Sequence, residues 1–109
     1  MAKATDIARI CQVLSAEARV RIVQLLRGSA LCVGALAERL GVTQGAVSQH
    51  LRILRDAGLV IPEKRGCYVH YRLDPKALAR WRQALGRLLT AAEEKPCRRT
   101  RRKEKRHVR

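Results

Sequence analysis

Two short apolar stripes at helical spacing follow one another in the segment 33–54, and Gly41 separates them. The first stripe contains Val33, Leu36, Ala37 and Leu40; the second contains Val47, Leu51 and Leu54. Spacings of three and four residues place each stripe on one buried helical face. Thr43 is a good N-cap for the second helix. The segment therefore predicts a helix-turn-helix.

The polar side of the second helix carries hydrogen-bonding side chains and no large apolar group. Its members are Gln44, Ser48, Gln49, Arg52 and Arg55. Amide, hydroxyl and guanidinium groups hydrogen-bond base edges and phosphates, so this face suits a major groove. We expect Gln44, Ser48, Gln49 and Arg52 to read the DNA sequence. The competing interpretation is an ordinary helical hairpin with a solvated face.

Two further helices are predicted upstream. The first is capped by Thr5 or Asp6, and one of its faces holds Ile7, Ile10, Cys11 and Leu14. The second starts near Ser15, runs to about Arg27 and is apolar over much of its circumference, which predicts a central position. Its arginines Arg19, Arg21 and Arg27 are expected to point outward. Residues 30–32 form a short link or strand.

The pattern changes period after Gly58 and predicts a β-hairpin. Leu59 to Ile61 begin an extended segment, Pro62 to Gly66 are turn-like, and residues 68–73 alternate as a strand. The tip carries Lys64 and Arg65, and the outer strand carries Arg72. We expect these three cations to contact the phosphate backbone beside the groove.

Asp74 as cap and Pro75 at the first helical position mark the start of a last helix. Its apolar stripe comprises Leu78, Trp81, Leu85, Leu88, Leu89 and Ala92. The hairpin cannot cover this stripe, so we expect it to pack on the first helix and on a second subunit. A two-fold dimer would set two recognition helices about 34 Å apart, which predicts an inverted-repeat operator.

The net charge of +15 favours a polyanionic partner. Residues 97–109 carry eight Lys or Arg and one Glu, so +7 lies there and +8 in residues 1–96. With no Phe, one Trp and two Tyr, the chain lacks the stacking platforms of single-strand binders, which favours double-stranded DNA. We expect one DNA-binding and dimerisation domain over residues 1–94 and a disordered basic tail over residues 95–109.

Other functional classes are less compatible with the sequence. The sequence contains neither a Gly-rich phosphate loop nor a nucleophile paired with a base, so it does not indicate an enzyme. We expect that no cofactor is required. No apolar run approaches the roughly twenty residues of a membrane span, so we expect a cytoplasmic protein without a membrane partner. A sequence-neutral nucleic-acid-binding protein, driven by the basic tail, stays an alternative.

The order of elements resembles the ArsR/SmtB family of dimeric winged helix-turn-helix repressors over roughly residues 5–92. Leu31, Cys32, Val33 and Leu36 are similar to the family's "LCVxxL" entry to its third helix. Ser48, His50 and Leu51 are similar to its "SxHL" recognition helix, and the wing match comprises Gly66, Val69, Tyr71, Arg72 and Leu73. The resemblance implies a mostly α-helical fold with a small β-hairpin. It also implies a repressor whose operator affinity falls when a thiophilic metal, metalloid or oxidant acts as inducer.

The inducer site departs from the family pattern. Family sensors of arsenic and cadmium carry "CVC" at the third-helix entry; here the first position is Cys32 and the second is Gly34. Family zinc sensors use carboxylate and His ligands along the last helix, whereas residues 75–92 contain no His or Asp, which excludes that site. In the recognition helix, a packed and hydrogen-bonded His50 is favoured over a metal ligand.

Four cysteines at positions 11, 32, 67 and 97 form no CxxC or CxC pair. Cys32 precedes a helix N-terminus and Cys97 lies among cations, and both settings favour the thiolate. Cys11 is either an inert core residue or a third thiol, and Cys67 is expected to be a bystander. In one hypothesis Cys32, Cys97 and Cys11 bind As(III) or another soft ion. In the other, the thiols form a disulfide or polysulfide link under oxidant or sulfide stress.

Overall fold

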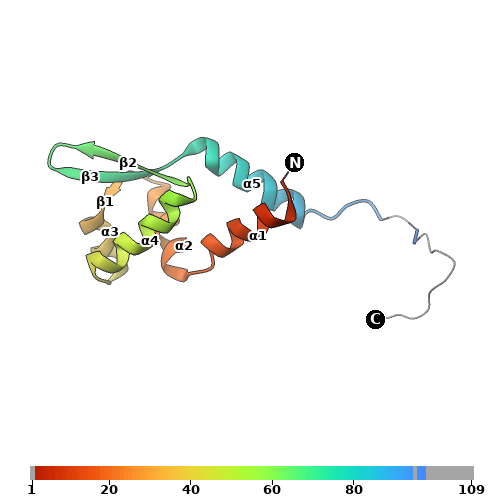
Figure 1. Cartoon of the computed structure of the whole chain (residues 1–109), viewed down its shortest axis with the longest axis horizontal. Coiled ribbons are helices and arrows are strands. Elements are labelled where there is room, and N and C mark those ends of the chain that lie inside the picture. Colours follow the sequence, from red (N-terminus) through yellow and green to blue (C-terminus); the bar gives the residue numbers. More distant parts are fainter. Residues whose placement is uncertain (1, 95, 98–109) are drawn as a thin grey trace.

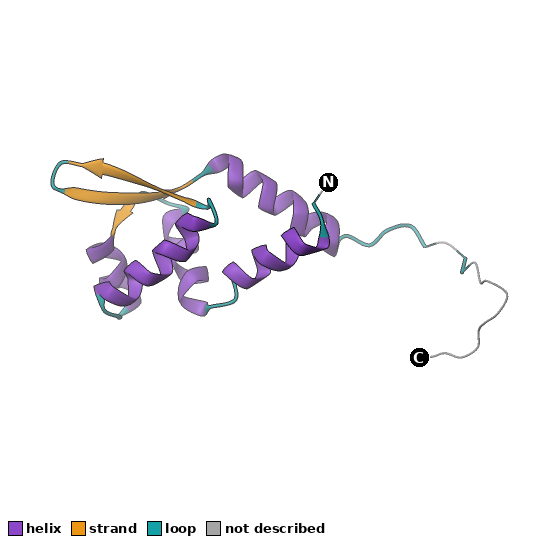
Figure 2. Cartoon of the chain, in the orientation of Figure 1, coloured by secondary structure: helices purple, strands orange, loops and turns teal. Residues whose placement is uncertain are grey.

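The computed structural model describes residues 2–94, 96 and 97. The predicted tail, residues 95–109, therefore lies outside the described residues except for Pro96 and Cys97. The described part contains, in chain order, α1 (Ala4–Val13), α2 (Glu17–Leu26), β1 (Leu31–Cys32), α3 (Val33–Leu40), α4 (Gln44–Asp56), β2 (Val60–Arg65), β3 (Tyr68–Leu73) and α5 (Pro75–Leu89). This order confirms the predicted winged helix-turn-helix, mostly α-helical with a small hairpin (Figure 2).

The core lies between α2, α3, α4 and the inner face of the sheet. Its largest fully buried side chains are Ile22, Leu36, Val47, Leu51, Leu54 and Leu59. Each such burial contributes roughly 1.5–3 kcal/mol relative to an exposed side chain. The apolar positions predicted for α4 are thus core positions, as are those of α3 except Val33, which is only half-buried against the core, and α2 is central as expected. Its Val20, however, remains exposed.

Local signals set the helix-turn-helix. Gly41 adopts a left-handed conformation, with φ of 73°, and its amide donates to the Ala37 carbonyl at 2.9 Å, which ends α3. Thr43 accepts a hydrogen bond from the Ala46 amide through Oγ1 at 3.1 Å, as expected of the N-cap of α4. The backbone at the end of α3 and the backbone at the start of α4 are thereby both hydrogen-bonded within three residues, and this short connection constrains the angle between the two helices.

At the N-terminus, Thr5 and Asp6 lie inside the first turn of α1, so neither is its N-cap. The N-cap is Lys3, and its backbone amide donates to the Asp6 carboxylate at 3.3 Å. The second helix starts at Glu17 with Ala16 as N-cap, one residue later than expected. These corrections move helix starts by one to three residues. On α1 the buried residues are Ile10 and Val13, whereas Cys11, predicted on the apolar face, is exposed.

The wing is larger than the sequence predicted. Residues 62–65 continue β2 as a strand, and the turn is confined to Gly66 and Cys67, with φ of 62° at Gly66. The segment 31–32 adds a third strand, and the strand order is β1-β3-β2. The strand β3 is therefore central, so the prediction of an outer strand carrying Arg72 is wrong. A central strand needs partners on both edges, and β1 supplies the second.

Helix α5 begins as predicted, with the Asp74 carboxylate accepting from the Lys76 amide at 3.0 Å and Pro75 at the first position. It ends at Leu89, so Ala92 lies beyond it and the predicted stripe is one turn too long. Helices α1 and α5 contact one another at the end of the molecule opposite the wing (Figure 1). Within the described residues, no helix is long and apolar enough to cross a bilayer.

Candidate nucleic-acid interface and thiol positions

The polar face predicted for the recognition helix is present on α4. Gln44, Ser48, Gln49 and Arg52 are exposed, whereas Val47, Leu51 and Leu54 on the opposite face are buried in the core. Packing of the apolar face against α2 and α3 turns the four polar side chains toward solvent. The helix thus presents amides, a hydroxyl and a guanidinium in one row, which is the donor and acceptor set that base edges require.

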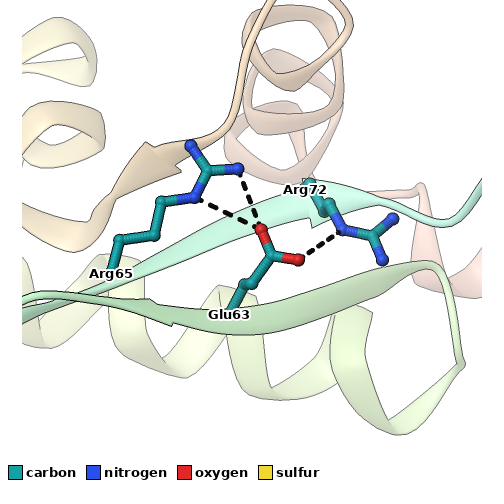
Figure 3. Close-up of polar contacts among 3 residues, drawn as sticks. All are labelled: Glu63, Arg65 and Arg72. Atoms are coloured by element: carbon teal, nitrogen blue, oxygen red, sulfur yellow. Dashed lines mark hydrogen bonds and ion pairs between the residues drawn. The ribbon is translucent and has the colours of Figure 1, made fainter.

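An ion-pair cluster on the wing involves two of its three predicted phosphate contacts (Figure 3). Glu63 accepts hydrogen bonds from Arg65, at 2.8 Å from its Nη2 and 3.2 Å from its Nε. The other carboxylate oxygen accepts from Arg72 Nε at 3.3 Å. The hydrogen bonds from Arg65 and then from Arg72 lower the pKa of Glu63 below its ordinary value. Lys64, the third predicted contact, is exposed on β2.

Strand register explains this cluster. Glu63 lies opposite His70, and Arg72 lies opposite Ile61, so Glu63 and Arg72 are diagonal neighbours on one face. Arg65 is two residues along β2 from Glu63 and shares that face. Nothing in the local sequence around Glu63 marks it as part of a cluster. The signal was available in the alternation of β2 and β3, but it required the register of the two strands.

Arg19 does not point outward as predicted. It is half-buried, its Nε donates to the carbonyl oxygen of Val13, and its Nη1 lies 3.1 Å from Nδ1 of His50. The expectation of a packed, hydrogen-bonded His50 is thus confirmed. The prediction that Arg19 points outward is wrong because two hydrogen-bond acceptors, one at the end of α1 and one on α4, lie within reach of its guanidinium group.

The four cysteines are all free thiols in separate parts of the fold. Cys11 is exposed on α1, so inert packing in the core of the chain is wrong. Cys67 is exposed in the wing turn, and Cys97 is exposed beyond α5. Only Cys32 is half-buried, as the N-cap of α3. Across residues 2–94, 96 and 97, no group of three or more His, Cys, Asp or Glu is placed to hold a metal ion.

The surroundings of Cys32 include two features that the sequence did not reveal. Cys32 pairs in register with His70, which pairs on its other side with Glu63, so the three residues form a row across the sheet. Among the described residues, Nδ1 of His70 is buried without a hydrogen-bond partner. A Cβ atom added at Gly34 would lie 4.0 Å from Sγ of Cys32 and 3.6 Å from Nε2 of Gln44. The helix N-terminus therefore has room beside the thiol.

An open groove with apolar walls runs between α1 and α5. Its walls include Ile7, Ile10, Trp81, Ala84 and Leu88. Leu88 and Leu89 at the end of α5 are 56% and 78% exposed. Exposed leucines beside an apolar groove are typical of a surface that another protein surface covers.

The family model described as "Bacterial regulatory protein, arsR family" matches residues 16–61. The HTH-type transcriptional regulator Rv2034 of Mycobacterium tuberculosis is 43% identical over 84 residues, which cover 77% of this chain and 78% of that protein. The arsenical resistance operon repressor of Escherichia coli is 41% identical over 68 residues, covering 62% of this chain and 58% of the repressor.

Solved structures agree with the sequence matches. A possible transcriptional regulator for arsenical resistance superposes with a TM-score of 0.69 at 39% identity, covering 75% of this chain and 85% of that one. Reduced HlyU from Vibrio cholerae superposes with a TM-score of 0.66 at 32% identity, covering 81% and 93%. Rv2034 and the arsenical resistance operon repressor are transcriptional regulators, which are not enzymes. The family-model match over residues 16–61 includes the helix-turn-helix, and the two superpositions cover 75% and 81% of this chain.

Proposed function

The chain belongs to the ArsR family of bacterial regulatory proteins, and on that premise we propose that it is a sequence-specific transcriptional repressor released from DNA by a thiol-reactive inducer. One observation carries the proposal. The recognition helix α4 exposes Gln44, Ser48, Gln49 and Arg52 on one face while its other face is held in the core. A major groove accepts such a helix, and the basic wing beside it supplies phosphate contacts.

The proposal includes a homodimer formed through α1 and α5. The groove between these helices and the exposed Leu88 and Leu89 provide an apolar surface at the end of the molecule opposite the wing. A two-fold axis at this end leaves both recognition helices and both wings free for DNA. The operator is then an inverted repeat with half-sites one helical turn apart.

For the inducer we propose As(III) or another soft ion, bound by thiolates. The half-buried Cys32 at the start of α3 is its principal ligand, with Cys97 and Cys11 as further thiols supplied across the dimer. The arsenical resistance operon repressor of Escherichia coli, similar to this chain, supports the choice of As(III). The dimer is needed because the described residues of one chain form no three-ligand metal cluster.

A second candidate is a thiol-redox repressor of the same fold, in which these cysteines form a disulfide or polysulfide link. Three of the four thiols are exposed and so accessible to an oxidant, and one structural relative is described as reduced HlyU. Titration of the reduced protein with arsenite, followed by thiolate absorption and by operator binding, separates the two. Release of DNA by persulfide but not by arsenite would exclude the metalloid.

Sequence-specific DNA binding, on which the repressor proposal depends, is tested by selection from a random duplex library. A repressor recovers one inverted-repeat sequence and retains its preference when residues 97–109 are removed, losing only uniform affinity and salt dependence. A sequence-neutral binder recovers no common sequence and loses nearly all binding with the tail. These outcomes distinguish the two functional classes without knowledge of the inducer.

A further inference from the structure

One guanidinium connects three helices of the fold. Arg19 lies on α2, its Nε donates to the carbonyl oxygen of Val13, and its Nη1 contacts Nδ1 of His50 on α4 at 3.1 Å. Val13 is the last residue of α1, whose terminal carbonyls have no partner within the helix. Arg19 therefore joins the end of the helix that packs on α5 to the helix that faces DNA.

The direction of the contact with His50 follows from chemistry. A guanidinium has donors and no acceptor, so Nδ1 of His50 accepts and the ring carries its proton on Nε2. Both side chains are half-buried, which keeps the contact partly shielded from water. A hydrogen bond with a charged donor is stronger than one between neutral groups.

This contact constrains α4 in a way that its apolar face does not. Val47, Leu51 and Leu54 hold α4 against the core, but apolar attraction is non-directional and tolerates small rotations. A hydrogen bond depends on direction, so it fixes the rotation of the helix about its axis. His50 follows directly on Gln49 and is two residues from Arg52, which are both exposed readers on the same helix.

We propose that Arg19 is a positioning residue for operator readout, because it holds the recognition helix at a fixed rotation through His50. The inference rests on the proposed function as a sequence-specific DNA-binding protein. Arg19 acts through His50 and touches no base. Its loss therefore reduces affinity for the correct sequence, which needs exact alignment of base contacts, more than affinity for any duplex, which needs only charge.

Arg21 provides a matched control. It lies on the same helix, carries the same charge, and its Nη2 donates to the carbonyl of Arg39 at 3.3 Å, so Arg21→Ala also removes one cation and one hydrogen bond. Binding is measured with a duplex that the wild-type chain selects from a random-sequence library and with a scrambled duplex of the same length. Arg19→Ala is expected to weaken binding to the selected duplex roughly tenfold beyond Arg21→Ala. Scrambled-duplex binding should be equal in the two variants.

Two further measurements separate positioning from a role in folding. His50→Ala retains the contact of Arg19 with Val13, and it should show the same selective loss; the double variant Arg19→Ala/His50→Ala should lose no more than His50→Ala alone. The ¹⁵N chemical shift of His50 Nδ1 should change in Arg19→Ala and remain unchanged in Arg21→Ala. If Arg19→Ala fails to fold, the His50→Ala result decides.

Four results would overturn the inference. Equal weakening on both duplexes would make Arg19 a phosphate contact, and additive losses in the double variant would separate it from His50. If Arg19→Ala binds the selected duplex as tightly as Arg21→Ala does, Arg19 has no role in operator readout, and the repressor proposal is unaffected. If the wild-type chain selects no preferred duplex, the repressor proposal fails, and the inference fails with it.

Discussion

Glu63 and Arg72 form an ion pair across the wing, with a carboxylate oxygen 3.3 Å from the guanidinium Nε (Figure 3). The second oxygen of Glu63 contacts Arg65 at 2.8 Å. Both arginines are predicted phosphate contacts, so a carboxylate of this chain occupies donors that DNA phosphates would use. Because all three side chains are substantially exposed, these ion pairs are weak, and DNA phosphates can compete with Glu63 for the two guanidinium groups.

Glu63→Gln is therefore expected to strengthen binding to every duplex alike. The substitution removes one negative charge from the wing and with it the ion pairs of position 63 with Arg65 and Arg72. The slope of log affinity against log salt concentration should therefore steepen by about 1. Binding to selected and scrambled duplexes over a range of salt concentrations measures it. Glu93→Gln beyond α5 is the control of equal charge. Weaker binding by Glu63→Gln would show that Glu63 orients the arginines toward DNA instead.

The lowered pKa of Glu63 predicts a pH window for the ion pairs. Arg65 and then Arg72 stabilise the carboxylate, so its pKa in the folded chain lies below the ordinary value of 4.5. Such a group stabilises the fold fully above pH 4.5, and this contribution is lost as the pH falls through the lowered pKa. Thermal unfolding of wild type and Glu63→Gln should differ above pH 4.5 and converge below it. A difference that grows toward acid would contradict the prediction.

Much of this architecture was predictable from the sequence because it depends on local signals. The buried faces of α3 and α4 follow from apolar spacing, and Thr43, Asp74 and Pro75 mark helix starts through their own side chains and backbone. These signals act within one helix turn, so a single segment of sequence contains them.

The remaining features depend on residues far apart in the chain. The third strand arises from the pairing of Cys32 with His70, and Arg19 turns inward because of an acceptor on α4, 31 positions away. Glu63 gains its partners through strand register. Each of these contacts depends on how completed elements pack; strand alternation shows which face Glu63 shares, but not which residues lie opposite it.

The predicted base-reading residues of α4 and the predicted phosphate-contacting cations of the wing should respond differently to substitution. Replacing Arg52 or Gln49 by Ala is expected to weaken binding to the selected duplex by roughly 1 to 3 kcal/mol and to relax preference at one base position. Lys64→Ala should weaken all duplexes alike and reduce the salt slope by about 1. Competition between duplexes mutated at single positions measures both. A uniform loss for Arg52→Ala would assign Arg52 to a phosphate.

The exposed leucines at the end of α5 predict how the subunits associate. Leu88→Glu places a charge in the apolar groove beside α1, and burial of that charge in an interface is unfavourable, so the proposed dimer should dissociate. Sedimentation velocity over a concentration series measures the change. Gln24→Glu on the exposed side of α2 adds the same charge and should leave the dimer intact. An unchanged dimer in Leu88→Glu would place the interface elsewhere.

Gly34 offers the most direct test of Cys32 as an inducer thiol. A Cβ atom at this position lies 4.0 Å from Sγ of Cys32 and 3.6 Å from Nε2 of Gln44, both ordinary contacts, so a Cβ atom fits without strain. Gly34→Cys then adds a second thiol beside the first, and two thiolates at one helix N-terminus bind a thiophilic ion more tightly than one. We expect Gly34→Cys to bind arsenite more tightly than wild type and to release DNA at lower arsenite concentrations.

Gly34→Ala, which adds the Cβ without sulfur, should respond as wild type does. If Gly34→Cys gains nothing over Gly34→Ala while both still bind DNA, Cys32 is not available to the ion, and the proposal for As(III) would have to rest on Cys11 and Cys97 alone.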